Sequence, residues 1–168
     1  MRQLLLAATL GLAVFGIQAC QVKPLYYSGN NTEQSLASVA IKPVDDRVSQ
    51  ELRNRLIFLY SGGKGEPVNA AYTMDFTVTG RASQVLREQL SDGITSQRYS
   101  ATVVYTLMDN ETKKVIGSGE RTVVTFYDQT TQEFANRRAL RDAQNRAAQE
   151  LAEIIRADTA SIVTRESG

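Results

Sequence analysis

Three arginines, Arg81, Arg87 and Arg98, are spaced so that their side chains could bind an anion together. Each occupies a polar position of an alternating segment, so we expect all three on one face of a β-hairpin. The predicted pairing places Arg87 directly opposite Arg98, where like charges destabilise a sheet by about 0.2–1 kcal/mol. A phosphate or carboxylate between the two guanidinium groups would remove this repulsion. The alternative is that solvent screens the arginines, or that Glu88 and Asp92 compensate their charge.

The composition offers little for catalysis. The 168 residues include no histidine and one cysteine, so histidine-based acid–base catalysis, cysteine–histidine nucleophiles and the usual zinc sites lack their side chains. The carboxylates of Asp45 and Asp46 precede a predicted helix, where capping is their expected role. With 19 basic and 18 acidic residues, the chain has almost no net charge, so its overall electrostatic field does not attract nucleic acid. The sequence therefore predicts a binding protein that is not an enzyme and has no cofactor, no metal and no nucleic-acid partner.

The N-terminal segment predicts export and lipidation. Arg2 precedes an apolar stretch at residues 4–17, which is shorter than the about 20 residues that span a membrane. Residues 17–20 read Ile-Gln-Ala-Cys and resemble the bacterial lipobox, although Gln18 departs from its usual second position. We therefore expect residues 1–19 to be a signal peptide and Cys20 to carry the acyl chains, palmitate among them, that anchor the protein. The alternative is an ordinary signal peptide followed by a free cysteine.

The residues after Cys20 indicate where the anchor lies. Gln21 stands where bacterial lipoproteins kept in the inner membrane typically have aspartate, so by this resemblance we expect the periplasmic side of the outer membrane. Residues 20–37 are mostly polar and predict a lipidated tether. The folded domain is expected over residues 38–168.

One long hairpin is expected to position the arginines. Apolar residues alternate with polar ones from Tyr72 to Met108, apart from the predicted turn. Asp92 and Gly93 suit a two-residue type I′ turn, because both central positions need positive φ. The resulting register pairs Val78 with Leu107 and places both apolar rows on one face, whereas a slip of one residue would separate them.

The remaining segments complete a layered α+β fold. A short strand is expected at residues 38–44, a helix up to Tyr60, a strand at 114–126 with a bulge near its glycines, and a long helix capped by residues 128–131. Phe134 begins the apolar stripe of that helix. The order β-α-β-β-β-α predicts a two-layer α/β sandwich, with a four-stranded, mostly antiparallel sheet and two helices on one face. The second face of the sheet is left free.

A glycine-rich segment follows the first predicted long helix. Gly63, Lys64 and Gly65 resemble a phosphate-binding loop only superficially. A true P-loop precedes its helix and has serine or threonine after the lysine, whereas this segment follows a helix and has Gly65 after Lys64. We expect the helix to end at the preceding residues Ser61, Gly62 and Gly63.

Several of these features together resemble the LptE family of lipopolysaccharide-assembly lipoproteins. They are the lipobox, the Val-Ala-Ile-Lys-Pro-Val strand, the Leu-Arg-Asn-Arg-Leu helix, the Tyr-x-Met-x-Phe-x-Val strand, Arg98-Tyr99 in the next strand, Asp109 at the following turn, and the terminal helix rich in Ala, Leu and Ile. The resemblance implies an outer-membrane lipoprotein that plugs the LptD β-barrel translocon, helps it to assemble, and assists lipopolysaccharide insertion into the outer leaflet. Arg81, Arg87 and Arg98 are then candidates to meet lipid A phosphates.

Two other classes of protein remain open. The first is an auxiliary envelope lipoprotein of a lipid-transport ABC system, or an activator of peptidoglycan synthases, which would present the same faces to another partner. The second is a module that binds a small ligand between its helices and sheet. A pull-down distinguishes the first class, and an apolar pocket large enough for a ligand would favour the second.

Overall fold

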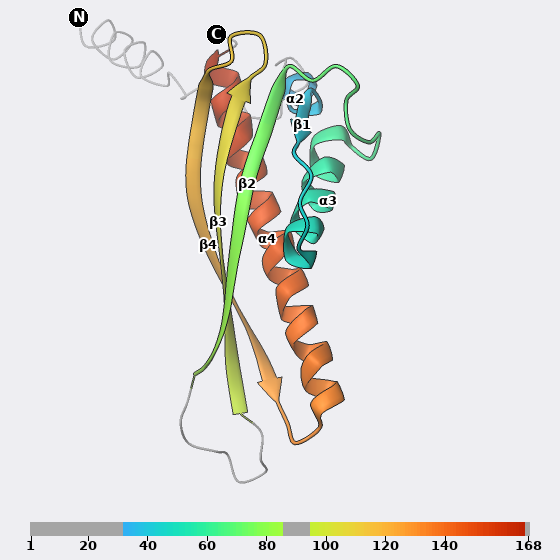
Figure 1. Cartoon of the computed structure of the whole chain (residues 1–168), viewed down its shortest axis with the longest axis vertical. Coiled ribbons are helices and arrows are strands. Elements are labelled where there is room, and N and C mark those ends of the chain that lie inside the picture. Colours follow the sequence, from blue (N-terminus) through green and yellow to red (C-terminus); the bar gives the residue numbers. More distant parts are fainter. Residues whose placement is uncertain (1–31, 86–94, 167–168) are drawn as a thin grey trace, which may run out of the picture.

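The computed structural model describes residues 32–85 and 95–166, and these form three helices and one sheet. In chain order the elements are α2 (Thr32–Ala37), β1 (Val39–Ile41), α3 (Arg47–Ser61), β2 (Tyr72–Gln84), β3 (Thr95–Asp109), β4 (Val115–Gln129) and α4 (Glu133–Glu166). Figure 1 shows α3 and α4 on the same side of the sheet, with α4 running along the strands. The predicted two-layer fold is therefore confirmed. Cys20, Arg87 and the turn at Asp92 and Gly93 lie outside the described residues.

The four strands follow one another in the sheet in chain order. β1 pairs in parallel with the start of β2, and the other pairs are antiparallel. The alternating apolar positions of β2 and β3 face the helices, as predicted, and most of them are buried, whereas Tyr72 and Val78 are partly buried. The core between sheet and helices includes Met74, Val103, Tyr105, Leu107 and, from β4, Val123.

The predicted register of β2 and β3 is wrong by four residues. Val78 pairs with Val103 and not with Leu107, and Arg98 lies opposite Ser83 and not opposite Arg87. The apolar rows keep their face because a shift of four is even, and side chains alternate with a period of two. The pattern therefore specified the face and left the register open.

Close packing of glycines against tyrosines fits the observed register. The Tyr99 ring crosses Gly80 on the neighbouring strand, where a Cβ atom would overlap the tyrosine hydroxyl group. The Tyr105 ring crosses Gly119 of β4 in the same way, with its hydroxyl oxygen 2.6 Å from the position of a Cβ atom. Each glycine thus leaves room that the buried ring needs.

β4 and α4 depart from prediction at their junction. The bulge expected near the glycines is present, because Leu107 pairs with Gly117 while Met108 pairs with Val115. β4 continues to Gln129, however, so residues 128–131 do not cap a helix that begins only at Glu133. The side chain of Asn136 holds the connection between β4 and α4. It accepts a hydrogen bond from the Thr130 amide at 2.7 Å and donates one to the Thr130 carbonyl oxygen at 2.8 Å.

α3 begins and ends as its sequence predicts. The Asp46 carboxylate caps it by accepting hydrogen bonds from the backbone amides of Val48 at 3.1 Å and Ser49 at 3.0 Å. Burial alone would raise the pKa of Asp46, but the hydrogen bonds from Ser49 and Val48 outweigh it and lower the pKa below its ordinary value. Gly62 ends the helix in the left-handed conformation, with φ of 61°.

α4 lies close to the sheet and to α3 because its buried face is rich in alanine, including Ala143, Ala147 and Ala148. Phe134 was expected to begin this apolar stripe, but its side chain is 74% exposed on the first turn of the helix. A polar contact also fixes the helix to the sheet. The Tyr105 hydroxyl group donates to Asp158 at 2.8 Å, and Arg121 binds the same carboxylate at 2.9 Å.

The short helix α2 was not predicted. It occupies the end of the expected tether and contributes Leu36, which is 1% exposed, to the core. The hydroxyl groups of Thr32 in α2 and Thr164 in α4 lie 3.0 Å apart. Within the described residues, the packed domain therefore begins before residue 38.

Candidate functional site

The uncovered face of the sheet carries the two predicted site residues that the structure describes. Both long helices lie on the other face, so the polar positions of β2 and β3 are open to solvent among the described residues (Figure 1). Arg81 lies opposite Ser100 and Arg98 lies opposite Ser83, which makes the two arginines diagonal neighbours on adjacent strands. Side chains at such positions are within reach of one ligand.

A shallow hollow of about 520 Å³ lies between these arginines. Besides Arg81 and Arg98, its lining consists of the hydroxyl-bearing residues Thr79, Ser83, Ser100 and Thr102. Nη2 of Arg98 donates a long hydrogen bond to the Ser83 hydroxyl oxygen at 3.4 Å. The hollow therefore offers two guanidinium groups and several hydroxyl groups, which together suit an oxyanion.

Neither arginine forms an ion pair with the residues that the structure describes, whereas five other arginines do. The paired arginines are Arg53, Arg55, Arg121, Arg137 and Arg146. Asp128 is the acidic residue nearest in register, because it lies opposite Ser96, two positions from Arg98. Among the residues that the structure describes, no carboxylate therefore neutralises the positive charge at the hollow.

Exposed apolar side chains border the hollow on β4. Phe126 lies opposite Arg98 and Val124 lies opposite Ser100, and these side chains are 55% and 42% exposed. Val104, on the same face of β3, is 51% exposed. Large apolar side chains on an uncovered sheet face mark a surface for binding when they gather beside polar groups. This face can accordingly contact a molecule that has both anionic and apolar parts.

Sequence reasoning identified Arg81 and Arg98 but missed their surroundings. The apolar positions of β4 do not share one face along its whole length, so Val124 and Phe126 could not be assigned to a side from the pattern alone. The bulge beside Gly117 reconciles the two ends of the strand. The sequence predicted this bulge, but a bulge near the glycines does not decide whether Val123 or Val124 faces the helices.

The described residues offer no metal centre. They contain no cluster of three or more His, Cys, Asp or Glu side chains that could hold a metal ion. Nor does any helix in the described ranges combine the length and the apolar composition needed to cross a membrane.

Residues 35–159 match a family model described as LptE, lipopolysaccharide-assembly. None of the curated proteins compared with this chain matches it. Among solved structures, the chain is similar to a putative lipoprotein from Caulobacter crescentus, with 25% identity and a TM-score of 0.64 over 81% of this chain and 97% of the other.

Two further structures share the fold at lower identity. One is a minor lipoprotein from Acinetobacter baumannii, with 17% identity, a TM-score of 0.55, and coverage of 73% of this chain and 88% of the other. The other is the rare lipoprotein B from Shewanella oneidensis, with 13% identity, a TM-score of 0.57, and coverage of 77% and 97%.

Proposed function

Because the chain belongs to the LptE family of lipopolysaccharide-assembly proteins, we propose that it assists the insertion of lipopolysaccharide into the outer leaflet of the outer membrane. The family match over residues 35–159 is the observation that carries this proposal, since it includes the whole sheet, α3 and most of α4. The protein is anchored through acyl chains on Cys20 and faces the periplasm. It acts by binding and positioning, without catalysis.

The partner in this proposal is a β-barrel of the LptD type, whose lumen the domain fills and whose assembly it helps. The length of the domain supports a plug, because the 34 residues of α4 extend about 51 Å at a rise of about 1.5 Å per residue. The hydrocarbon core of a bilayer is only about 30 Å thick. The polar sheet face also suits the interior of a large barrel, which is polar.

The ligand contact in this proposal is the hollow on the free sheet face. The guanidinium groups of Arg81 and Arg98 bind a lipid A phosphate, and the exposed side chains of Val124 and Phe126 contact its acyl chains. The absence of ion pairs at both arginines within the described residues supports this role. Arg87 remains a candidate for the same phosphate.

Affinity purification of the mature lipoprotein from solubilised outer membranes tests the partner. We expect a large β-barrel to co-purify in stoichiometric amount. Recovery of an inner-membrane lipid transporter or of a peptidoglycan synthase in its place would refute the plug and favour an auxiliary lipoprotein of those systems.

Site-specific photocrosslinking tests the ligand. A photoreactive phenylalanine analogue at Ser100, within the hollow, is expected to crosslink lipopolysaccharide, whereas the same analogue at Glu150, on the exposed side of α4, is not. The paired change Arg81→Glu with Arg98→Glu should abolish the crosslink. Arg141→Glu is the matched control, since it reverses an exposed arginine on the helix side. Equal crosslinking from all variants would contradict the proposed contact.

A further inference from the structure

The short strand β1 covers only the beginning of β2. It pairs with the first three residues of β2, and just beyond it the Lys42 amide donates to the Met74 carbonyl oxygen at 3.0 Å. Pro43 follows, and it has no amide hydrogen with which to continue the pairing. Beyond this point β2 itself is the edge of the described sheet, as Figure 1 shows.

The backbone groups of β2 that point away from β3 belong to its even-numbered residues. The Val85 amide donates to the Ser96 carbonyl oxygen at 3.1 Å, and in an antiparallel pair such bonded residues alternate with unbonded ones. The Tyr72 amide, which donates to the Ser38 carbonyl oxygen at 3.3 Å, shows the same alternation on the side of β1. In the uncovered part of the strand, outward amide and carbonyl groups therefore belong to Val78, Gly80, Ala82 and Gln84.

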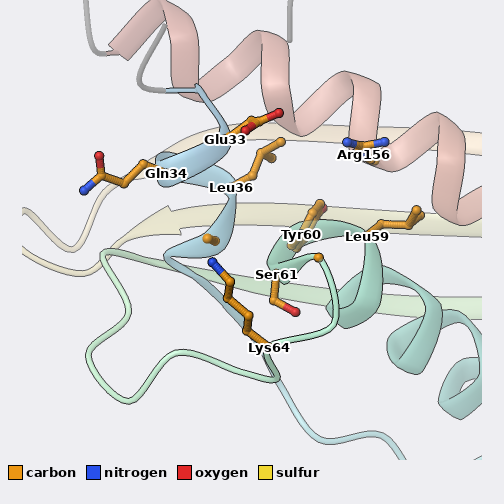
Figure 2. A pocket seen from close by; sticks show the side chains of 10 residues that line it. Glu33, Gln34, Leu36, Leu59, Tyr60, Ser61, Lys64 and Arg156 are labelled. Atoms are coloured by element: carbon orange, nitrogen blue, oxygen red, sulfur yellow. The ribbon is translucent and has the colours of Figure 1, made fainter. Parts of the chain in front are cut away.

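Side chains cap the outward backbone groups of the edge strand β1. The Ile41 amide donates to Oε1 of Glu66 at 3.3 Å, and the Ile41 carbonyl oxygen accepts from Nη2 of Arg53 at 3.2 Å. The loop after α3, on which Figure 2 shows Lys64, brings Glu66 to this position. This part of the edge cannot pair with another strand until these contacts break.

The opposite edge of the sheet, β4, is capped by arginines. The carbonyl oxygen of Glu120 accepts from Nη1 of Arg121 at 2.9 Å, and that of Phe126 accepts from Nη2 of Arg146 at 2.9 Å. Within the described residues, no such contact reaches the outward groups at residues 78–84 of β2. An uncapped edge is a template for a further strand, which is why proteins commonly block their edges with charged side chains.

The side chains at residues 78–84 define the kind of strand that fits this open edge. Thr79, Arg81 and Ser83 lie on the free face, whereas Val78 and Ala82 are partly buried towards the helices. An added strand that matches them is polar on one side and apolar on the other. Because Arg81 forms no ion pair with a described residue, an acidic side chain opposite it is favoured by its charge.

We propose that the open edge at residues 78–84 pairs with a strand of the β-barrel partner before that barrel closes. Strands of such barrels alternate between apolar and polar side chains, and their sheet has unpaired edges until its first and last strands meet. Pairing with β2 protects one of these edges, and closure releases the strand because the barrel strands then pair with each other. This inference rests on the barrel partner of the proposed function and states how the chain assists barrel assembly.

Hydrogen exchange of the full chain in a nonionic detergent tests the edge directly. The probe is the peptide Thr-Val-Glu-Val-Thr-Val-Glu, which alternates as a barrel strand does. It should slow exchange of the outward amides of Val78 and Ala82 about tenfold and leave that of Thr122, on the β4 edge, unchanged. A peptide with lysine in place of glutamate should protect them less, because it repels Arg81.

Two results of this measurement would overturn the proposal. One is unchanged exchange at Val78 and Ala82 in the presence of the glutamate peptide. The other is protection of these amides that rises with protein concentration when no peptide is present, because the occupant of the edge is then a second copy of the chain.

Proline variants connect the edge to barrel assembly. Ala82→Pro removes an outward amide hydrogen without removing a bond to β3, and proline is tolerated at such edge positions. Glu120→Pro makes the same change on the β4 edge and is the matched control. The assay refolds the chain together with the urea-unfolded barrel that the pull-down recovers. Ala82→Pro should slow the formation of folded barrel about fivefold, as expected for one lost hydrogen bond, and Glu120→Pro should not.

The outcomes separate this inference from the proposed function. Equal folding rates with Ala82→Pro and with the parent chain overturn the edge pairing and leave the barrel partner intact. Gln84→Pro removes another outward amide and gives the same test if Ala82→Pro lowers the melting temperature. A pull-down without a barrel refutes the plug, and it also overturns the assignment of the docked strand to a barrel, even if the peptide still protects β2.

Discussion

Gly119→Ala should destabilise the protein by pushing a buried tyrosine away from its partner. The new Cβ atom would lie 2.6 Å from the hydroxyl oxygen, 2.7 Å from Cζ and 2.9 Å from Cε1 of Tyr105. Because Tyr105 is 2% exposed and packed among core residues, its ring cannot swing into solvent. The substitution must therefore displace the ring, the strand or both.

The magnitude follows from three contributions. Overpacking a core costs about 1–3 kcal/mol. Loss of the hydrogen bond from Tyr105 to the Asp158 carboxylate costs about 1.5–3 kcal/mol, although Arg121 continues to neutralise that carboxylate. Alanine offsets about 0.5–1 kcal/mol, because it loses less backbone entropy than glycine on folding. The expected net loss is about 1.5–5.5 kcal/mol in the free energy of unfolding.

Equilibrium urea unfolding measures this loss, provided that the slope of free energy against urea is unchanged. Ser118→Ala is the matched control, because the neighbouring side chain points to the free face and should change stability by less than about 0.5 kcal/mol. Adding Tyr105→Phe to Gly119→Ala removes the closest overlapping atom, so the two losses should not add. A Gly119→Ala variant as stable as the parent protein would refute the packing argument.

Three further predictions concern the helices and the pH dependence of stability. Asp46→Ala should lower the free energy of unfolding by about 0.5–2 kcal/mol, because the α3 cap is lost. The folded pKa of Asp46 is lowered, so its charge contributes full stability above the unfolded pKa of about 3.9, and this stability is lost as the pH falls through the folded pKa. In Asp46→Asn the melting temperature should therefore fall less steeply with decreasing pH on the acid side. Burial, and then the hydrogen bond to Asp158, raise the pKa of Tyr105, so the stability that its neutral hydroxyl group contributes is complete below about pH 10 and is lost as the pH rises through the folded pKa. If the melting temperature of Tyr105→Phe falls with increasing pH as steeply as that of the parent protein, this argument is wrong. Leu36→Ala should cost about 2–5 kcal/mol in chemical unfolding, whereas Gln34→Ala should cost little, and equal small effects would show that α2 does not contribute to the core.

The layers and faces of the fold could be read from the sequence because each depends on a period. Alternation assigned Met74 and Tyr105 to the core and Arg81 and Arg98 to the free face, and the structure confirms all four. The N-cap at Asp46 followed from residue type and position. These signals are local, so they survive an error in how the strands pair.

Features that depend on packing between distant residues could not be predicted in the same way. The register depends on where the rings of Tyr99 and Tyr105 find space, and no local pattern pairs these tyrosines with Gly80 and Gly119. α2 spans six residues and has one buried apolar side chain, Leu36, which is too short for a helical period to be visible.

The corrected register also changes the chemistry expected at the site. The predicted hairpin placed Arg87 opposite Arg98, an arrangement suited to one anion held between two charges. The observed pairing sets Arg98 between Ser83 on one strand and Phe126 on the other, so the guanidinium group has a hydroxyl neighbour and an aromatic neighbour. A free phosphate would use only the polar side of this arrangement, whereas a phosphorylated lipid would use both sides. Phe126→Ser should therefore weaken lipopolysaccharide crosslinking from Ser100 while leaving the affinity for inorganic phosphate unchanged.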